Sequence, residues 1–177
     1  GGDGAGGGLD ELGQRAHDLG LGAAMAFEHD VGGVAHEHVD ALVAEGAEGG
    51  VGEAVAELRL DNPSKLYALT QPLVEALETH CAALERNPAV AAVVLSAEGE
   101  RAFCAGADIN AWSALSPAEF ARHWVREGHR IFDRLARLSK RSIAAIQGPA
   151  FGGGLERAAA CDFRVMAPAA TLALPEA

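Results

Sequence analysis

The sequence contains no long apolar run and no secretory signal pattern. No uninterrupted apolar stretch among its 177 residues approaches the roughly 18 residues that a bilayer-spanning helix needs. The first residues are rich in glycine and acidic residues, without the basic and then apolar order that marks a signal peptide. We therefore expect no membrane partner.

Cysteine is scarce, and no two cysteines form a CxxC pair. The three cysteines, Cys81, Cys104 and Cys161, are an odd number, which does not favour a disulfide framework. The pattern is typical of reduced thiols and predicts a cytoplasmic protein. No cluster in the sequence points to a metal site or a redox cofactor.

Basic residues are outnumbered, with 14 Lys and Arg against 25 Asp and Glu and a formal net charge of −11. Because nucleic-acid binding needs a basic surface, this balance argues against a nucleic-acid partner. The basic residues before position 60 are only Arg15 and Arg59, whereas several arginines lie between Arg122 and Arg141. This second group favours a solvated helix face over a contact with an anionic ligand.

Large apolar residues are rare in the first fifty positions. Residues 1–50 are rich in Gly, Ala, Asp and Glu and open with GGDGAGGG. Such a segment cannot bury much apolar surface. We expect residues 1–50 to be a flexible or weakly helical leader and residues 51–177 to form the folded domain.

From residue 51 onward, the pattern alternates between strands and helices. AVAELRL (54–60) alternates apolar and polar residues like a half-buried strand, whereas VAAVVLS (90–96) is nearly all apolar, like a strand buried on both faces. Thr70 and Ser116 are expected to cap two helices. The expected elements are strand 54–60, a helix from Thr70 to Asn87, strand 90–96, a helix from Ser116, strand 142–148, a short helix to Cys161 and strand 162–167. This order predicts an α/β fold.

Three glycines precede one of these helices, in FGGGLE (151–156), with Glu156 in its first turn. A helix N-terminus carries unpaired N–H groups and a partial positive charge, and glycines let a ligand oxygen approach them. The sequence lacks the lysine of a GxxxxGK[ST] loop, so a nucleotide site is weakly supported. Close packing of the helix on its strand explains the glycines about equally well.

A second loop of small residues, FCAGADI (103–109), also follows a predicted buried strand. Two such loops after neighbouring strands can present one backbone N–H each to the same oxygen. Two donors aimed at one developing negative charge form an oxyanion hole. The pair of loops therefore favours a catalytic site over packing alone.

The segments RAFCAGADI (101–109), AAIQGPAFGGGLE (144–156) and ACDFRVMAPAATLALPE (160–176) resemble the crotonase (enoyl-CoA hydratase/isomerase) family. The resemblance covers about residues 51–177 and implies a crotonase-like ββα spiral with acyl-CoA thioester substrates. By motif position, the oxyanion-hole amides are those of Ala107 and Gly153. The positions expected to contact coenzyme A are Ala105, Gly106, Ile109 and Gly152. Coenzyme A is part of the substrate, so no separate cofactor is implied.

The resemblance also implies two catalytic glutamates. Glu156 is the glutamate of the motif GGGxE, and Glu176 is the glutamate of the later motif PE. Hydration of a conjugated double bond needs a base that activates water and an acid that protonates the α carbon, and these roles fall to Glu156 and Glu176 respectively. Isomerases of the family generally need only the glutamate that matches Glu176. Three alternatives to hydration remain: isomerisation, another crotonase activity such as thioester hydrolysis, and a non-catalytic CoA-binding remnant.

Three features depart from the family pattern. Tyr67 stands where asparagine is usual, and Arg157 stands where an apolar residue packs, so its charge must reach solvent or find a partner. The sequence ends at Ala177, where the family continues through more of the spiral and a region that builds a homotrimer or dimer of trimers. We therefore expect an incomplete spiral, truncated at the C-terminus, with an exposed apolar surface.

Overall fold

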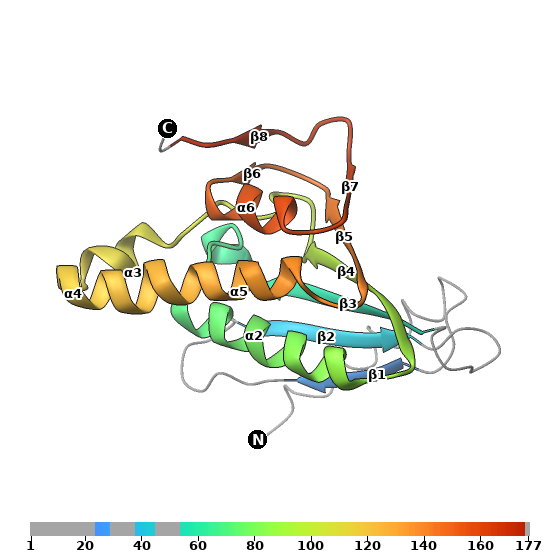
Figure 1. Ribbon diagram of the computed structural model, residues 1–177. Helices are drawn as coiled ribbons and strands as arrows, with labels where there is room; N and C mark the ends of the chain where they lie inside the picture. Colours follow the sequence, from blue (N-terminus) through green and yellow to red (C-terminus); the bar gives the residue numbers. More distant parts are fainter. Residues whose placement is uncertain (1–23, 29–37, 45–53, 176–177) are drawn as a thin grey trace, which may run out of the picture.

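The computed structural model describes residues 24–28, 38–44 and 54–175, and its centre is a six-stranded sheet (Figure 1). The strands lie in the order β1-β2-β3-β4-β5-β7. Their bounds are Ala24–Glu28 for β1, His38–Ala44 for β2, Ala54–Asp61 for β3, Val90–Ala97 for β4, Arg141–Ile146 for β5 and Phe163–Met166 for β7. The first three strands pair antiparallel, and β3, β4, β5 and β7 pair parallel.

Helices and one small sheet complete the fold. The helices are η1 (Pro63–Lys65), α2 (Gln71–Arg86), α3 (Ile109–Ser113), α4 (Pro117–Glu119), η2 (Phe120–Arg126), α5 (Glu127–Ala136) and α6 (Gly153–Ala159). In Figure 1, α2 and α5 lie side by side, and α2 packs on β2 and β3. The short strands β6 (Ala150–Phe151) and β8 (Leu172–Ala173) pair parallel beside α6. Within the described part of the chain, no helix is both long and apolar enough to cross a membrane.

The strands predicted from 54–60 and 90–96 are confirmed as β3 and β4. Along β3 the buried positions alternate with half-buried ones, and Ala56, Leu58 and Leu60 are fully buried. In β4, Val93 and Leu95 are fully buried as well. Because these strands lie inside the sheet, their side chains form the centre of the hydrophobic core.

The first helix is confirmed with its predicted cap. The Thr70 hydroxyl accepts a hydrogen bond from the Leu73 backbone N–H, and the helix ends at Asn87. Leu73, Leu77 and Cys81 are buried along one face, as their spacing predicts. The direction of α2 is therefore determined locally, and this matters because residues 66–69, just before it, line one of the glycine loops.

The helix predicted from Ser116 begins with the expected capping box, in which Ser116 and Glu119 bond reciprocally. It continues through η2, which is π-helical, into α5. Trp112 packs against Trp124 and Phe120, with ring centroids 4.3 Å and 5.5 Å away respectively. Sequence periodicity did not predict the π-helical stretch, which widens the turn beside this aromatic cluster.

Part of the predicted leader is different from the expectation. Residues 24–28 and 38–44 form β1 and β2, so these stretches are extended rather than helical. Backbone hydrogen bonds to the open edge of β3 do not require an apolar pattern, which is why composition gave no sign of the strands. Val39 is fully buried, and its carbonyl oxygen lies 3.1 Å from the His80 ring nitrogen Nε2. The other residues of 1–50 lie outside the described ranges, and the boundary near residue 50 stays a prediction.

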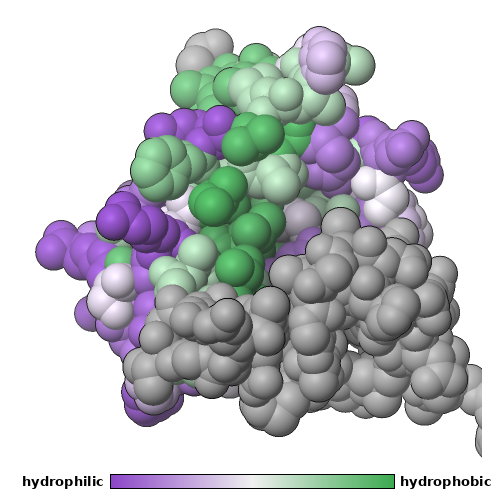
Figure 2. Space-filling view, turned by 90° about the vertical axis from the view of Figure 1, so that its right-hand side faces the viewer, coloured by the Kyte–Doolittle hydropathy of each residue, from purple (hydrophilic) through white to green (hydrophobic). Residues whose placement is uncertain are grey.

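The predicted strand 162–167 is confirmed as β7, but all four of its residues are exposed. Large apolar side chains on β7, β8 and the segment after β8 are 41–63% exposed: Phe163, Val165, Met166, Leu172 and Leu174. Figure 2 shows apolar residues gathered on the face of the molecule where β7 lies. The expected exposed apolar surface is therefore present at this edge of the sheet.

Candidate active site at two glycine loops

The first loop, residues 103–108, lies against residues 66–69. The Ala105 N–H donates to the Leu66 carbonyl oxygen over 3.0 Å. The Leu69 N–H donates to the Gly106 carbonyl over 2.7 Å, and the Asp108 N–H donates to the Leu69 carbonyl over 2.9 Å. These three bonds fix the path of the loop on both sides of Ala107.

The bonding pattern leaves the Ala107 amide free. Leu69 and Ala107 form an isolated parallel bridge, in which both polar groups of Leu69 bond to the residues that flank Ala107. The N–H of Ala107 therefore points away from Leu69. Among the described residues, the Ala107 N–H has no hydrogen-bond acceptor.

The second loop leads into α6. Gly152 adopts φ 48° and ψ −120°, a conformation that residues with a side chain rarely adopt. Its N–H donates to the Ala173 carbonyl, whereas Gly153 begins the helix. An N–H at the first position of a helix has no partner within the helix. Gly153 thus offers a second unpaired amide, at the positive end of the helix dipole.

The structure brings the two loops together. The Phe151 N–H donates to the Cys104 carbonyl over 3.0 Å, and Cys104 and Ala150 form a parallel bridge. A Cβ placed on Gly106 would lie 2.9 Å from the Phe151 carbonyl oxygen and 3.7 Å from the Gly153 nitrogen. The backbones of the two loops are therefore in contact next to both free amides.

Gly152, Gly153 and Gly154 of the second loop have different structural roles. A Cβ on Gly154 would overlap the Cys104 carbonyl oxygen and lie 2.8 Å from the Cys104 Cβ, so Gly154 allows α6 to pack directly on the first loop. Gly152 supplies the turn, and Gly153 supplies the amide. Close packing therefore explains Gly154, whereas the oxyanion role of Gly153 stays a prediction.

Glu156 lies in the first turn of α6 and is exposed. Its carboxylate oxygen Oε2 lies 3.8 Å from the position that a Cβ on Gly153 would occupy. Leu69 Cδ1 and Phe132 Cζ lie 3.1 Å and 4.0 Å from the same position. A carboxylate, a free amide and two apolar side chains therefore border the same space. Glu176 lies outside the described residues, so its place relative to Glu156 is not part of this geometry.

The residues expected to contact coenzyme A lie on both loops. Ala105 is half-buried, Gly106 and Gly152 are buried, and Ile109 is 73% exposed at the start of α3. Gly106 has φ 98°, which requires glycine because it lies in the left-handed region. The exposure of Ile109, a large apolar side chain, leaves it available to a ligand.

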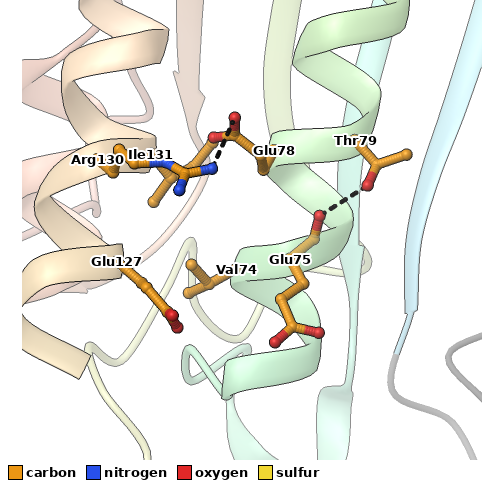
Figure 3. Close-up of a pocket in the computed structure, with 7 residues that line it drawn as sticks. All are labelled: Val74, Glu75, Glu78, Thr79, Glu127, Arg130 and Ile131. Atoms are coloured by element: carbon orange, nitrogen blue, oxygen red, sulfur yellow. Dashed lines mark hydrogen bonds and ion pairs between the residues drawn. The ribbon is translucent and has the colours of Figure 1, made fainter. Parts of the chain in front are cut away.

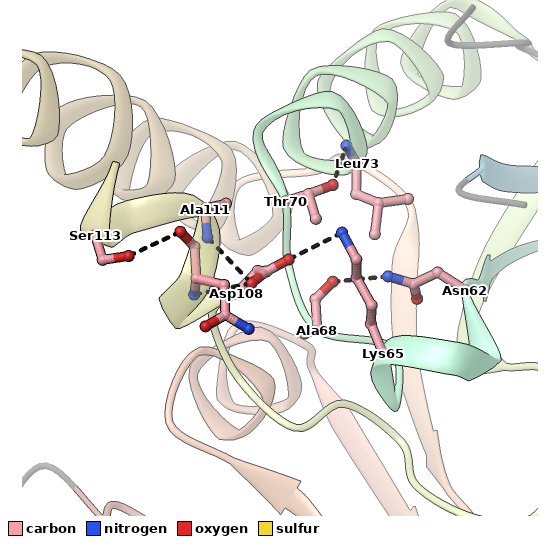
Figure 4. A network of polar contacts seen from close by, with 9 residues as sticks. Asn62, Lys65, Ala68, Thr70, Leu73, Asp108, Ala111 and Ser113 are labelled. Atoms are coloured by element: carbon pink, nitrogen blue, oxygen red, sulfur yellow. Dashed lines mark hydrogen bonds and ion pairs between the residues drawn. The ribbon is translucent and has the colours of Figure 1, made fainter. Parts of the chain in front are cut away.

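An ion pair that the sequence pattern did not predict lies beside the first loop (Figure 4). Lys65 Nζ lies 3.0 Å from Asp108 Oδ2, and Asp108 Oδ1 accepts the N–H groups of Asn110 and Ala111 at the start of α3. Burial acts to raise the pKa of Asp108, but Lys65 and the two amides outweigh it and hold the pKa below its ordinary value. Asp108 is therefore the N-cap of α3. Lys65 is the last residue of η1, and its position in the sequence gives no sign of a contact with the loop 103–108.

The turn between β3 and α2 is strained. Leu66 and Tyr67 have φ of 52° and 59°, a left-handed conformation that costs energy for residues other than glycine and asparagine. This turn directs the Leu66 carbonyl toward the Ala105 N–H. Tyr67 is buried, and burial raises the pKa of its hydroxyl. The tyrosine therefore combines a strained backbone with a packed ring at the asparagine position of the resembled family.

Arg157, which follows Glu156, is fully buried. Its Nη2 donates to the carbonyl oxygens of Ser96 and Phe103, and its guanidinium carbon lies 4.0 Å from the centroid of the Phe103 ring. Desolvation by burial lowers the pKa of the guanidinium. The expectation that this charge must find a partner is met by two carbonyls and a ring.

All three cysteines are free and buried. Burial raises the pKa of Cys81 to about 12 and that of Cys161 to about 11, and it raises the pKa of Cys104 as well. A buried neutral thiol is a poor nucleophile. Cys104 therefore contributes packing to the first loop, and its backbone contributes the contact with α6.

A separate hollow of about 280 Å³ lies between α2 and α5 (Figure 3). Its charged lining side chains are Glu75, Glu78, Glu127 and Arg130, and Arg130 Nη2 lies 3.4 Å from Glu78 Oε1. None of the candidate site residues lines it. Arg130 and Arg134 both pair with Glu78. The solvated helix face is confirmed by the exposure of most arginines in this group: Arg122, Arg126, Arg130, Arg137 and Arg141.

A family model for enoyl-CoA hydratase/isomerase matches residues 55–177. The mitochondrial enoyl-CoA hydratase of Pongo abelii is 37% identical over 132 residues, which are 72% of this chain and 42% of that protein. The crotonyl-CoA hydratase of Syntrophomonas wolfei is 35% identical over 124 residues, which are 70% of this chain and 47% of that protein. The chain thus spans less than half the length of these relatives.

Solved structures agree with the family model. An enoyl-CoA hydratase from Bacillus anthracis matches with a TM-score of 0.64 and 33% identity, over 67% of this chain and 45% of that chain. An enoyl-CoA hydratase/carnithine racemase from Magnetospirillum magneticum matches with a TM-score of 0.67 and 28% identity, over 76% and 49% respectively. The mixed α/β architecture is the crotonase fold over the part that they share, and the chain belongs to the enoyl-CoA hydratase/isomerase family.

Proposed function

We propose that the site hydrates a 2-enoyl-CoA thioester to a 3-hydroxyacyl-CoA. The observation that carries the proposal is the convergence of two unpaired amides, at Ala107 and Gly153, with the Glu156 carboxylate beside one of them. Two preorganised amides favour an oxygen that gains negative charge, which is what the thioester oxygen does during addition. A carboxylate beside it can act on water.

In this mechanism, the two amides bind the thioester oxygen and stabilise the enolate. Glu156 accepts a proton from water as the oxygen of that water bonds to the β carbon. The α carbon then takes a proton from Glu176, a role that rests on the motif match alone.

The coenzyme A part of the substrate would lie along the first loop. Ala105 and Ile109 face its adenine end in this proposal, and Gly106 and Gly152 allow the chain to approach the thioester closely. The exposed Ile109 supplies apolar area for this contact. No separate cofactor enters the proposed reaction.

The test is turnover of crotonyl-CoA, followed by loss of the enoyl-thioester ultraviolet absorbance, in the wild type and in Glu156→Gln. Loss of a general base is expected to lower kcat by about 10²–10⁴-fold. Glu75→Gln is the matched control, because Glu75 is also an exposed glutamate near the start of a helix. Equal activity of wild type and Glu156→Gln would contradict the assigned role of Glu156.

Isomerisation is the second candidate, because a family isomerase needs only the glutamate at position 176. A 3-enoyl-CoA substrate separates the two: double-bond migration that survives Glu156→Gln favours isomerisation. A third candidate, a CoA-binding remnant, predicts that the folded chain binds a thioester and self-associates with concentration but turns nothing over. The homotrimer or dimer of trimers that the family resemblance implies is likewise a proposal, because the chain spans under half of its relatives' length.

A further inference from the structure

Arg157 connects three segments that carry the candidate site. Its guanidinium Nη2 lies 3.4 Å from the carbonyl oxygen of Ser96, at the end of β4, and 3.2 Å from that of Phe103. Phe103 opens the loop that presents the Ala107 amide, and Arg157 itself lies on α6, next to Glu156. One side chain therefore joins β4, the first loop and the helix that begins the second half of the site.

The environment of this side chain is unfavourable for a charge. Arg157 is completely buried, and within the described part of the chain no carboxylate forms an ion pair with it. Its Nε and Nη1 atoms have no hydrogen-bond partner there. A well-packed apolar side chain at such a place usually gives equal or greater stability than a buried charge. Overall stability therefore does not account for an arginine here, whereas a specific geometric role does.

The two carbonyls that Arg157 binds define that role. The Phe103 N–H donates to Pro149, just before β6, so the same residue also touches the segment that leads into the second loop. Gly154 places α6 directly on Cys104, one residue along from Phe103. A shift of Phe103 would therefore change the distance between the amides of Ala107 and Gly153.

We propose that Arg157 is a positioning residue that holds the first loop at the distance from α6 at which both free amides face one oxygen. It touches neither of those amides and acts through the Phe103 carbonyl and ring. The catalytic consequence rests on the proposed function, whereas the positioning of the loop does not. The expected effect is therefore local to residues 103–107 and falls on kcat rather than on substrate binding.

The experiment compares the wild type with Arg157→Met, which keeps a long side chain without charge or donors, and Arg157→Lys, which keeps the charge and one donor group. Hydrogen exchange of the amides of residues 103–107 is measured together with kcat and KM for crotonyl-CoA. We expect about tenfold faster exchange and at least tenfold lower kcat in Arg157→Met, with KM within about twofold and a thermal midpoint that does not fall. Arg157→Lys is expected to recover part of both losses.

Leu77→Val is the control for general core loosening, because Leu77 is buried on α2 and forms none of the hydrogen bonds that Arg157 makes to Ser96 and Phe103. It should lower the thermal midpoint without selectively speeding exchange at 103–107. Unchanged exchange at 103–107 in Arg157→Met would overturn the positioning role, whatever the activity. If the wild type turns over no crotonyl-CoA but Arg157→Met still speeds exchange selectively there, the proposed function fails while the positioning role stands.

Discussion

Each of the two glycine loops has an unpaired backbone amide, but the physical reason differs between the loops. In loop 103–108, the amide of Ala107 is free because the neighbouring residues are paired with Leu69 in a parallel bridge. In loop 151–156, the amide of Gly153 is free because it begins a helix, whose first N–H groups have no internal partner. The first loop depends on contacts with a distant segment, whereas the second depends on local helix geometry. Substitutions should therefore affect the two loops through different mechanisms.

The largest expected effect is that of Gly154→Ala, at the contact between the loops. The added methyl group would overlap the Cys104 carbonyl, and the Cys104 backbone and Cβ atoms that it would meet cannot rotate away as the end of a long side chain could. We expect a loss of about 3 kcal/mol in the free energy of unfolding, as for severe overpacking. Urea denaturation measures it. A loss below about 1 kcal/mol would show that α6 can move away from the first loop at little cost.

Gly106→Ala should have the next largest effect. The residue has φ 98°, and its new Cβ would lie 2.9 Å from the Phe151 carbonyl oxygen. We expect about 2 kcal/mol of destabilisation, because the strained conformation costs about 1–3 kcal/mol for a residue with a side chain. Denaturation together with crotonyl-CoA kinetics checks it. The comparison of the loops would fail if stability were unchanged while the Ala107 amide kept its exchange rate.

Asp108→Asn tests how strongly the first loop depends on the ion pair with Lys65. Asparagine keeps the helix cap but loses the charge, so we expect about 1 kcal/mol of destabilisation at neutral pH, reduced by the partial exposure of Lys65. The folded state lowers the pKa of Asp108, so this stability is complete above the unfolded-state pKa and is lost as pH falls through the lower, folded-state pKa.

Denaturation of wild type and Asp108→Asn across the acidic range measures this dependence. The difference between the two proteins should shrink only below the ordinary value of 3.8. A difference that stays constant through the acid range would exclude the ion pair as its source.

Gly128→Ala should have the smallest effect and the opposite sign. Gly128 lies in α5, and a Cβ there would meet no atom within 4 Å. Alanine in a helix interior is favoured over glycine by about 0.5–1 kcal/mol. A slightly higher thermal midpoint with unchanged kinetics is expected. Destabilisation here would mean that added volume alone, rather than the specific contacts of Gly106 and Gly154, explains the two larger losses.

Some features of the site could be read from the sequence because they are local. Glycines before a helix, an acid in its first turn, the Asp108 cap and the Thr70 cap depend on residues within a few positions of one another. The strand at 54–60 could be predicted because its burial alternates along the backbone, and the strand at 90–96 because its residues are nearly all apolar. The family resemblance rested on the same local motifs.

Other features could not be read in this way because distant segments create them. The strand 38–44 pairs with β3, and the strand 24–28 pairs with 38–44, through backbone bonds that leave little trace in composition. The ion pair of Lys65 with Asp108 joins residues more than forty positions apart, and the exposure of β7 depends on what lies beside it in the sheet. A single sequence carries no spatial signal for such contacts.

The sequence by itself determined the order of the main strands and helices from β3 to β7, the small-residue loops and the acid at the start of α6, because each follows from short-range backbone preferences. Only the tertiary structure decided that the two loops meet, that the Ala107 amide is left free, and that Arg157 is buried between two carbonyls rather than solvated. The physical reason is that hydrogen-bond satisfaction and burial depend on all segments that pack at one place.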